Sequence, residues 1–243
     1  MTLSLPGRIR VRSQPWRPPS PVASAFIRRI EAERRALEKV DREVEFADYG
    51  AGTSRDNRSA DEMARGLVSQ RRIGDICRIA SKPPRAARLL FALIREIRPD
   101  VCLELGTCLG ISTAYQAAAL ELNGRGFLYS VEGAAPLADE ARALLERLGL
   151  SHRVEIRTGR FADVLPDLLA SHEYGFAFVD GHHDEQATLG YFAQIRPSMQ
   201  AHGAMLFDDI TWSDGMRRAW ASIRADGAVG RTWTQLGMGL VEL

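Results

Sequence analysis

The sequence has few cysteines, no long apolar run and almost no net charge, and each absence excludes a class of protein. Its three cysteines, Cys77, Cys102 and Cys108, are odd in number and form no Cys-x-x-Cys pair, which argues against a disulfide framework and a structural zinc site. No stretch approaches the roughly 18 apolar residues of a membrane span, and the N-terminus lacks the apolar segment of a signal peptide. The formal net charge of +1 gives no global reason to expect binding to nucleic acid or a membrane. We therefore expect a cytoplasmic protein.

What is present suggests one α/β domain with a helical appendage, because 243 residues with 45% hydrophobic side chains can bury a sizeable core. Residues 1–20 are rich in arginine and proline and contain no acid, so we expect a basic flexible arm there. A solvated tail is the expected role of this arm, and an RNA- or phosphate-binding arm is the alternative. We expect residues 21–98 to form an N-terminal helical extension that caps the site, and residues 99–243 to form the α/β domain.

Apolar residues recur at helical spacing in the extension and predict helices over 22–40, 61–80 and 85–97. The polar segment YGAGTSRDNRSADEMARG is predicted to be a connecting loop. Its Gly50-Ala51-Gly52 turn lacks the preceding buried strand that a nucleotide-binding loop requires.

After Asp100 the pattern changes to short apolar strands that alternate with amphipathic helices. The predicted strands are 101–105, 127–131, 153–157, 175–180 and 203–208. The predicted helices are 111–122, 136–149, 162–171, 185–196 and 214–226. This alternation predicts a Rossmann-like, mostly parallel sheet with helices on both faces. The tail TWTQLGMGLVEL, with its central Gly237, predicts a terminal hairpin and hence an antiparallel last strand.

The segment VCLELGTCLGIST, residues 101–113, carries the most information about a ligand. A buried strand ends near Glu104, and Gly106 and Gly110 bracket a tight turn into a helix whose N-terminus offers free N–H groups. An acid at the strand end repels a pyrophosphate but can accept a hydrogen bond from an ammonium group. Ser112 and the loop N–H groups can hold a carboxylate, so an amino acid moiety fits better than a diphosphate. The alternative is an ordinary turn between strand and helix.

Two further strand ends continue the same site. Glu132, followed by Gly133, ends the next strand about 20 residues beyond the glycine loop, the interval at which nucleotide-binding sheets place a ribose-binding acid. After the third strand, Gly159 and Phe161 lie where an adenine should sit. Phe161 either stacks on that base or packs in the core.

The fourth and fifth strands of the domain end in FVDGHH and LFDDI, which place Asp180, Asp208 and Asp209 at one edge of a parallel sheet. Carboxylates at close range repel one another unless a cation or protons intervene. Oxygen-rich sites suit hard cations, so we expect Mg²⁺, or else Mn²⁺ or Ca²⁺, bound by these three aspartates. Such an ion would lower the pKa of a substrate hydroxyl. The alternative is that one or two of the aspartates cap the following helices.

His183, three residues after Asp180, is the candidate general base, because an imidazole can take a proton from a hydroxyl nucleophile near neutral pH. The alternative is that the adjacent histidines are polar surface. Trp212 either walls the substrate pocket or packs on a helix.

At these residues the chain resembles class I S-adenosylmethionine-dependent methyltransferases, and among them the metal-dependent catechol O-methyltransferase-like group. The similarity covers about residues 98–210 and rests on LELGTCLGIST and TGRFADVLP. It implies that Glu104, Gly106 and Ser112 serve the methionine end and that Glu132 binds the ribose hydroxyls. It also implies that Asp180 serves both the cofactor and catalysis, and that Asp180, Asp208 and Asp209 are metal ligands. The residues expected to bind S-adenosyl-L-methionine are Glu104, Gly106, Thr107, Gly110, Ser112, Glu132, Gly133, Gly159, Phe161 and Asp180.

The chain departs from that group at three positions. His183 stands where catechol-type enzymes have a lysine, Asp209 where the third ligand is usually asparagine, and Arg160 where some relatives have an acid. Catechol itself is therefore not implied. The whole chain is still more similar to bacterial methyltransferases of the methyltransferase-24 type, on the segments YGAGT, DGHHDEQATLGYF and FDDITWS.

The resulting expectation is a metal-assisted O-methyltransferase that acts on a small hydroxylated molecule, without nucleic acid or membrane partners, and with a homodimer as a further expectation. Three alternatives stay open. An RNA methyltransferase would show strongly salt-dependent RNA binding. A metal-dependent hydroxylase on the same scaffold would not release S-adenosylhomocysteine. A non-catalytic cofactor-binding protein would bind without turnover.

Overall fold

A computed structural model describes residues 20–50, 52 and 58–243. The predicted basic arm, apart from Ser20, lies outside the described residues, as does Ala51 of the glycine turn. The arm and the division at residues 20 and 98 therefore stay predictions.

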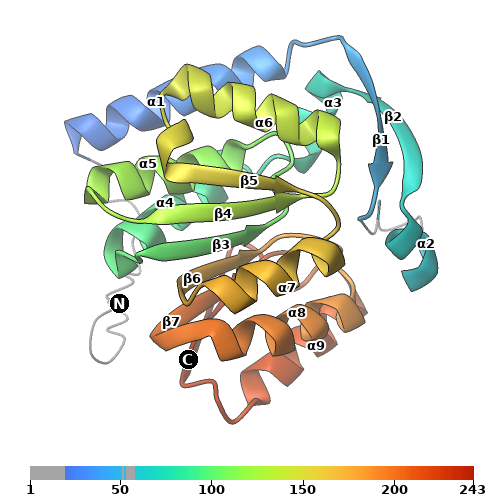
Figure 1. Ribbon diagram of the computed structural model, residues 1–243, viewed down its shortest axis with the longest axis vertical. Helices are drawn as coiled ribbons and strands as arrows, with labels where there is room; N and C mark the ends of the chain where they lie inside the picture. The colour runs from blue at the N-terminus through green and yellow to red at the C-terminus, as the bar shows by residue number, and fades with distance from the viewer. Residues whose placement is uncertain (1–19, 51, 53–57) are drawn as a thin grey trace.

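A seven-stranded sheet forms the centre of the described part of the chain, in the order β5-β4-β3-β6-β7-β9-β8 (Figure 1). Its strands are β3 (Val101–Leu105), β4 (Phe127–Glu132), β5 (Val154–Thr158), β6 (Tyr174–Val179), β7 (Met199–Phe207), β8 (Arg231–Gln235) and β9 (Met238–Glu242). The first five are parallel, and β9 runs antiparallel to both of its neighbours. The predicted Rossmann-like sheet with an antiparallel last strand is therefore confirmed.

Helices cover both faces of this sheet, as the alternation of strands and helices predicts. Successive residues of β3 point to opposite faces of the sheet and belong to different hydrophobic clusters. Cys102 packs in one cluster and Leu103 in the other. All six residues of β6 are buried, which a central strand requires. The helices of the α/β part are α5 (Ile111–Asn123), α6 (Ala135–Leu148), α7 (Phe161–Ser171), α8 (Glu185–Ile195) and α9 (Asp214–Ala225).

The N-terminal extension shares the core of the α/β part. Ile30 of α1 (Pro21–Leu37) and Leu90 of α4 (Pro84–Ile97) are fully buried in the same cluster as Ala118 of α5. Figure 1 shows α1, α4, α5 and α6 together on one side of the sheet. The extension thus adds a layer to the fold, and the segment after β1 (Glu43–Asp48) and the connection between α3 (Ile73–Ala80) and α4 reach the carboxyl end of the sheet.

The predicted helix over 61–80 is wrong, because that stretch holds α2 (Ala60–Arg65), β2 (Leu67–Arg72) and α3 (Ile73–Ala80). Gly66, with φ 75° and ψ 140°, ends the first of these helices. β2 pairs antiparallel with β1 (Glu43–Asp48), a partner distant in sequence, so tertiary pairing overrides local helical spacing.

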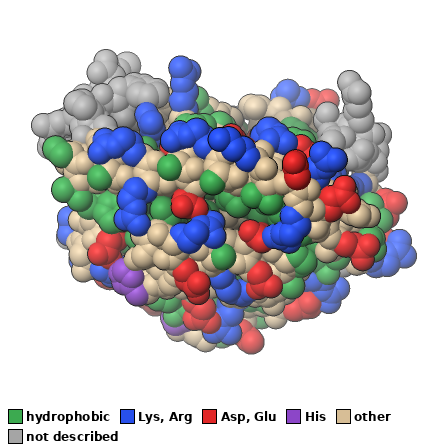
Figure 2. Space-filling view, turned by 90° about the horizontal axis from the view of Figure 1, so that it is seen from above, with side chains coloured by type: hydrophobic (Ala, Val, Ile, Leu, Met, Phe, Trp, Pro, Cys, Tyr) green, Lys and Arg blue, Asp and Glu red, His purple; other side chains and the backbone are tan. Residues whose placement is uncertain are grey.

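Two surface properties complete the description. None of the helices among the described residues combines the length and the apolar character needed to cross a lipid bilayer. On the face seen in Figure 2, basic and acidic side chains are interspersed, in keeping with the formal net charge of +1.

Candidate functional site

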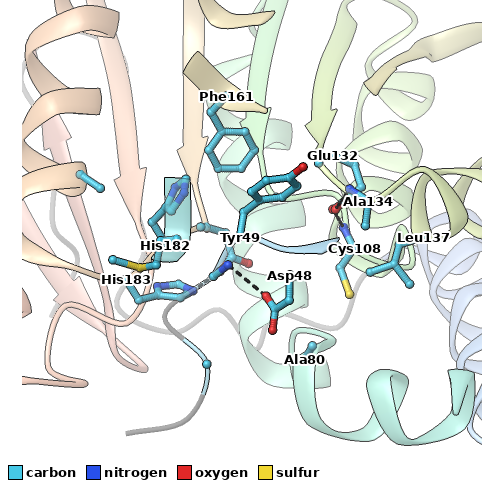
Figure 3. Close-up of a pocket in the computed structure, with 18 of the residues that line it drawn as sticks. Asp48, Tyr49, Ala80, Cys108, Glu132, Ala134, Leu137, Phe161, His182 and His183 are labelled. Atoms are coloured by element: carbon cyan, nitrogen blue, oxygen red, sulfur yellow. Dashed lines mark hydrogen bonds and ion pairs between the residues drawn. The ribbon is translucent and has the colours of Figure 1, made fainter. Parts of the chain in front are cut away.

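A cavity of about 930 Å³ lies at the carboxyl ends of β3, β4, β6 and β7, where an open parallel sheet binds its ligands. Figure 3 shows Tyr49, Phe161 and Glu132, which come from three separate elements, around this cavity. Its wall includes Tyr49, Lys82, Gly106, Cys108, Glu132, Gly133, Phe161, Asp180, His182, His183, Tyr191, Asp209 and Trp212.

The glycine loop after β3 is shaped by close packing. Gly106 has φ 101°, and a Cβ placed on it would lie 2.0 Å from the backbone oxygen of Asp180, so only glycine fits between these strand ends. Gly110 has φ 82°, and a Cβ there would lie 2.8 Å from Cβ of Ala141 on α6. Gly106 therefore reaches the cavity wall, whereas Gly110 sets the packing of two helices behind it.

Glu104 does not line the cavity, and its predicted contact with the methionine end stays a prediction. The side chain is fully buried, and its oxygens accept hydrogen bonds from the hydroxyls of Thr113 and Ser130, each at 2.6 Å. They also accept from the Ser112 hydroxyl at 2.7 Å and the Gln116 amide at 2.6 Å. Burial raises the pKa of Glu104, while these bonds oppose the rise. The carboxylate ties α5 to β3 and β4.

Other predicted cofactor residues also lie behind the wall. Ser112 is buried and is bonded to Glu104, and the hydroxyls of Thr107 and Ser130 lie 2.5 Å apart. Neither Ser112 nor Thr107 lines the cavity, and the same holds for Gly159, whose added Cβ would meet Val164. The structure therefore places these residues behind the cavity wall, and their contact with the cofactor stays a prediction.

Glu132 is the acid that the structure does place at the wall. Its Oε2 accepts a hydrogen bond from the N–H of Cys108 at 2.7 Å, and its Oε1 accepts one from the N–H of Ala134 at 2.9 Å. Burial raises its pKa. Next to it, Gly133 lies against Tyr49, since a Cβ on Gly133 would be 2.6 Å from the tyrosine ring. A carboxylate held at both oxygens and facing a cavity can accept hydrogen bonds from a pair of hydroxyls.

An aromatic group forms the neighbouring wall. The ring centroid of Phe161 lies 5.3 Å from that of His182 and 5.7 Å from that of Tyr191, both edge to face. The hydroxyl of Tyr191 lies 2.6 Å from Nδ1 of His182. Burial lowers the pKa of His182, so its imidazole is neutral near pH 7. This wall suits a flat ring with polar edges.

Lys82 also lines the cavity, and it lies among the predicted metal ligands. Its Nζ is 3.1 Å from Asp180 and also forms an ion pair with Asp208. The three side chains are only 10%, 12% and 4% exposed. Burial alone would lower the pKa of Lys82, but the charges of Asp180 and Asp208 raise it above its ordinary value. The lysine is therefore an ammonium.

His183 adjoins this cluster. Its Nε2 lies 3.6 Å from Oδ1 of Asp180, and its Nδ1 lies 3.9 Å from Oδ2 of Asp209. Its ring centroid is 6.2 Å from that of Trp212. Burial lowers the pKa of His183, which keeps the imidazole neutral and able to accept a proton.

The backbone at the cavity edge is strained. Seven non-glycine residues in the described ranges have positive φ, and four of them line the cavity. Such left-handed conformations cost on the order of 1–3 kcal/mol each and persist only where the surroundings hold them. The four are Cys108, His182, His183 and Asp209.

The predicted metal site does not fit this arrangement. Among the described residues, no group of three or more His, Cys, Asp or Glu side chains is arranged to hold a metal ion. The ammonium of Lys82 forms ion pairs with Asp180 and Asp208 and so balances part of their negative charge. The positive charge that close carboxylates require is thus supplied by a side chain of the protein. The assignment of Asp180, Asp208 and Asp209 as metal ligands therefore stays a prediction, one that this arrangement does not support.

The functional residues that sequence reasoning missed come from the extension and from α8. Tyr49 and Tyr191 lie in the segments YGAGT and DGHHDEQATLGYF, but neither residue was predicted to line the site, and Lys82 stands in no motif. Only the folded chain brings the three to the strand ends. The sequence does single out Lys82 in one respect. The chain has 32 basic residues, and Lys39 and Lys82 are the only lysines among them, so a lysine at this position is unusual for this chain.

Comparison with known proteins bears on the same region. Residues 103–210 match the family model described as a methyltransferase domain. The chain is similar to a catechol O-methyltransferase of Niastella koreensis, with 32% identity over 56% of this chain and 60% of that protein. It is also similar to tricin synthase 2 of Oryza sativa subsp. japonica, with 27% identity over 54% and 45%. The chain thus spans less than two thirds of the length of these relatives.

Solved structures share the fold. An O-methyltransferase from Bacillus cereus in complex with SAH has a TM-score of 0.59 and 24% identity, over 68% of this chain and 84% of that one. The O-methyltransferase TomG from Streptomyces achromogenes, in complex with SAM, has a TM-score of 0.60 and 22% identity, over 68% and 82%. The resemblance expected from LELGTCLGIST is confirmed, and the fold is that of class I methyltransferases.

Proposed function

On the premise that residues 103–210 form a methyltransferase domain, we propose that this protein transfers a methyl group from S-adenosylmethionine to an oxygen of a small hydroxylated molecule. The observation that supports this most strongly is the cavity itself, whose wall brings Glu132, Phe161, Asp180 and His183 together. Its volume of about 930 Å³ is at the upper end of the range for small-molecule sites, as a cofactor and an acceptor together require.

The residues at the wall fit the cofactor. Glu132 would accept hydrogen bonds from the ribose hydroxyls, since both of its oxygens are already fixed by backbone N–H groups. Phe161 would lie against the adenine, and the loop at Gly106 would lead to the methionine end beside Asp180. With Glu104 sealed in the core, Asp180 is the acid left for the ammonium group. When bound there, the cofactor supplies an electrophilic methyl group.

His183 would act as the general base. Its neutral imidazole can take the proton from the acceptor hydroxyl. The acceptor oxygen then forms its bond to the methyl carbon as the carbon–sulfur bond breaks and the electron pair stays on sulfur. Trp212, beside His183, would wall the acceptor side of the cavity. The protein's contribution is positioning, exclusion of water and removal of one proton.

A phenol is the acceptor class we propose. The similar proteins include a catechol O-methyltransferase, and Trp212, beside His183, offers aromatic surface for the acceptor. A metal-dependent hydroxylase on the same scaffold stays the alternative, and formation of S-adenosylhomocysteine as a product would exclude it. An RNA methyltransferase stays a second alternative, and strongly salt-dependent RNA binding would favour it.

The test is incubation of the full chain with S-adenosylmethionine and a panel of catechols, flavonoid phenols and aliphatic alcohols. Mass spectrometry would follow S-adenosylhomocysteine and the methylated product. We expect the methyl ether of a phenol as the product with the wild type, and no such product with His183→Gln. Turnover only on aliphatic alcohols would overturn the acceptor class, and cofactor binding without turnover on any acceptor would indicate a binding protein.

A further inference from the structure

We propose that Lys82 is the resident cation of this site: its ammonium lies where a divalent ion would sit and binds the acceptor oxygen, so methyl transfer here requires no metal. This inference rests on the proposed function for its chemical role. Its geometric part, that the lysine excludes a metal ion, is independent of turnover.

The charge balance around Lys82 supports the proposal. Three carboxylates meet at the strand ends, and the ammonium contacts Asp180 at 3.1 Å and pairs with Asp208. The third, Asp209, is 45% exposed and faces His183 instead. A divalent ion between Asp180 and Asp208 would have to displace a lysine that is 90% buried, or share the site with its positive charge.

The backbone of Lys82 is fixed, so the ammonium is not a mobile surface charge. Lys82 precedes Pro83, and a residue before proline is restricted to extended conformations. Its carbonyl accepts a hydrogen bond from Nη2 of Arg34 at 2.6 Å. Arg34 is itself buried and ion-paired with Glu31 at 3.2 Å. A rigid connection between α3 and α4 thus aims this side chain at the carboxylates.

The choice of lysine fits the task. The chain uses arginine almost everywhere, since Lys39 and Lys82 are the only lysines among 32 basic residues. A guanidinium is planar and spreads its charge over five N–H donors, whereas an ammonium is a compact point charge with three donors. Only the compact group resembles a metal ion in size and charge density.

The remaining capacity of the ammonium gives it a role toward the acceptor. Two of its three N–H donors point at Asp180 and Asp208, and Lys82 also lines the cavity. The third donor can therefore bind an oxygen in the cavity. A positive charge there stabilises the negative charge that develops on the acceptor oxygen as His183 removes its proton. This is the task of a metal ion in a metal-assisted site.

The experiment measures Mn²⁺ binding by electron paramagnetic resonance in the wild type, in Lys82→Met and in the matched control Lys39→Met, which alters an exposed lysine. We expect no stoichiometric binding in the wild type or in Lys39→Met up to about 1 mM Mn²⁺, a concentration at which even weak protein sites for divalent cations fill. Lys82→Met should bind about one ion, because it leaves the carboxylates uncompensated. Lys82→Arg keeps the charge and should still exclude Mn²⁺.

Activity supplies the second measurement. Wild-type turnover should be unchanged by a chelator, and Lys82→Met should lose about 100-fold or more in kcat, the scale of one lost electrostatic contact in a transition state. Stoichiometric Mn²⁺ binding by the wild type, or turnover lost to chelator and restored by Mg²⁺, would overturn the proposal. Both wild-type measurements stand even if Lys82→Met does not fold. Failure to methylate any acceptor would refute the proposed function but leave the Mn²⁺ titration decisive for the geometry.

Discussion

Glu132 faces the cavity, whereas Glu104, on the neighbouring strand, is sealed beneath α5 although both acids stand near strand ends. The register explains the difference. Glu104 pairs with Ser130, so Glu132 lies two residues farther along the same face. That step is roughly 7 Å along a strand, enough to separate a core acid from a ligand-binding one.

Replacing Glu104 with alanine should therefore affect the free energy of unfolding more than it affects cofactor binding. The change leaves a cavity in the core. It also leaves the buried hydrogen-bond donors of Ser112, Thr113 and Gln116 without their acceptor on Glu104. We expect a loss of about 2–5 kcal/mol in the free energy of unfolding, measured by urea denaturation. Asp139→Ala, at a side chain that is 73% exposed, is the control and should change it by less than about 0.5 kcal/mol. Equal stability of the two variants would contradict the structural role.

The loss of stability caused by Glu104→Ala should depend on pH. Burial raises the pKa of Glu104 in the folded state above its ordinary value of 4.5. The folded state then binds more protons than the unfolded state between these two values, so the acid's contribution to stability falls as pH rises through them. The destabilisation by Glu104→Ala should be largest near pH 4 and smaller at pH 7. A difference that grows with pH would show that the pKa is lowered instead.

Gly106 and Gly124 form a matched pair for backbone packing. Both have positive φ, but a Cβ on Gly106 would lie 2.0 Å from a backbone oxygen, while one on Gly124 would meet nothing within 4 Å. Gly124→Ala should cost about 1 kcal/mol from the left-handed backbone alone. Gly106→Ala should cost several times more, as thermal unfolding would show. Similar melting temperatures for the two variants would refute the close contact.

His183 should set the acid limb of the pH–rate profile. Because burial lowers its pKa, the neutral imidazole persists below the ordinary value of 6.5. Wild-type kcat should be flat above pH 7 and fall at lower pH with a midpoint under 6.5. His183→Gln should lower kcat by about 10²–10⁴-fold and remove that limb, with cofactor affinity kept. His152→Gln, at an exposed histidine, is the control.

The α/β part of the fold was predictable because its signals are local. Strands from Val101 onward alternate with amphipathic helices, and the structure confirms each of them within a few residues. Residues 61–80 could not be assigned, because β2 exists through pairing with β1, which no local pattern reports. Glu132 was found because a strand-end acid at the ribose interval is a sequence signal.

The site was predictable only where strand ends define it. Asp180, Asp208 and Asp209 lie at one edge of the sheet, as their positions at strand ends predicted, whereas the divalent cation expected between them stays a prediction. Lys82 could not be foreseen there, because it lies 98 positions before Asp180 and reaches it only through the packing of the extension. A single lysine before two prolines carries no motif.

The central claim is that the cavity binds the cofactor with Glu132 at its ribose. Calorimetry with S-adenosylhomocysteine tests it most directly, on the wild type, on Glu132→Ala and on Glu155→Ala, whose side chain is 43% exposed. We expect the wild type and Glu155→Ala to bind equally. Glu132→Ala should bind about 100-fold more weakly, because two hydrogen bonds to a carboxylate are lost. Equal affinity of Glu132→Ala and the wild type, or no binding by the wild type, would contradict the account.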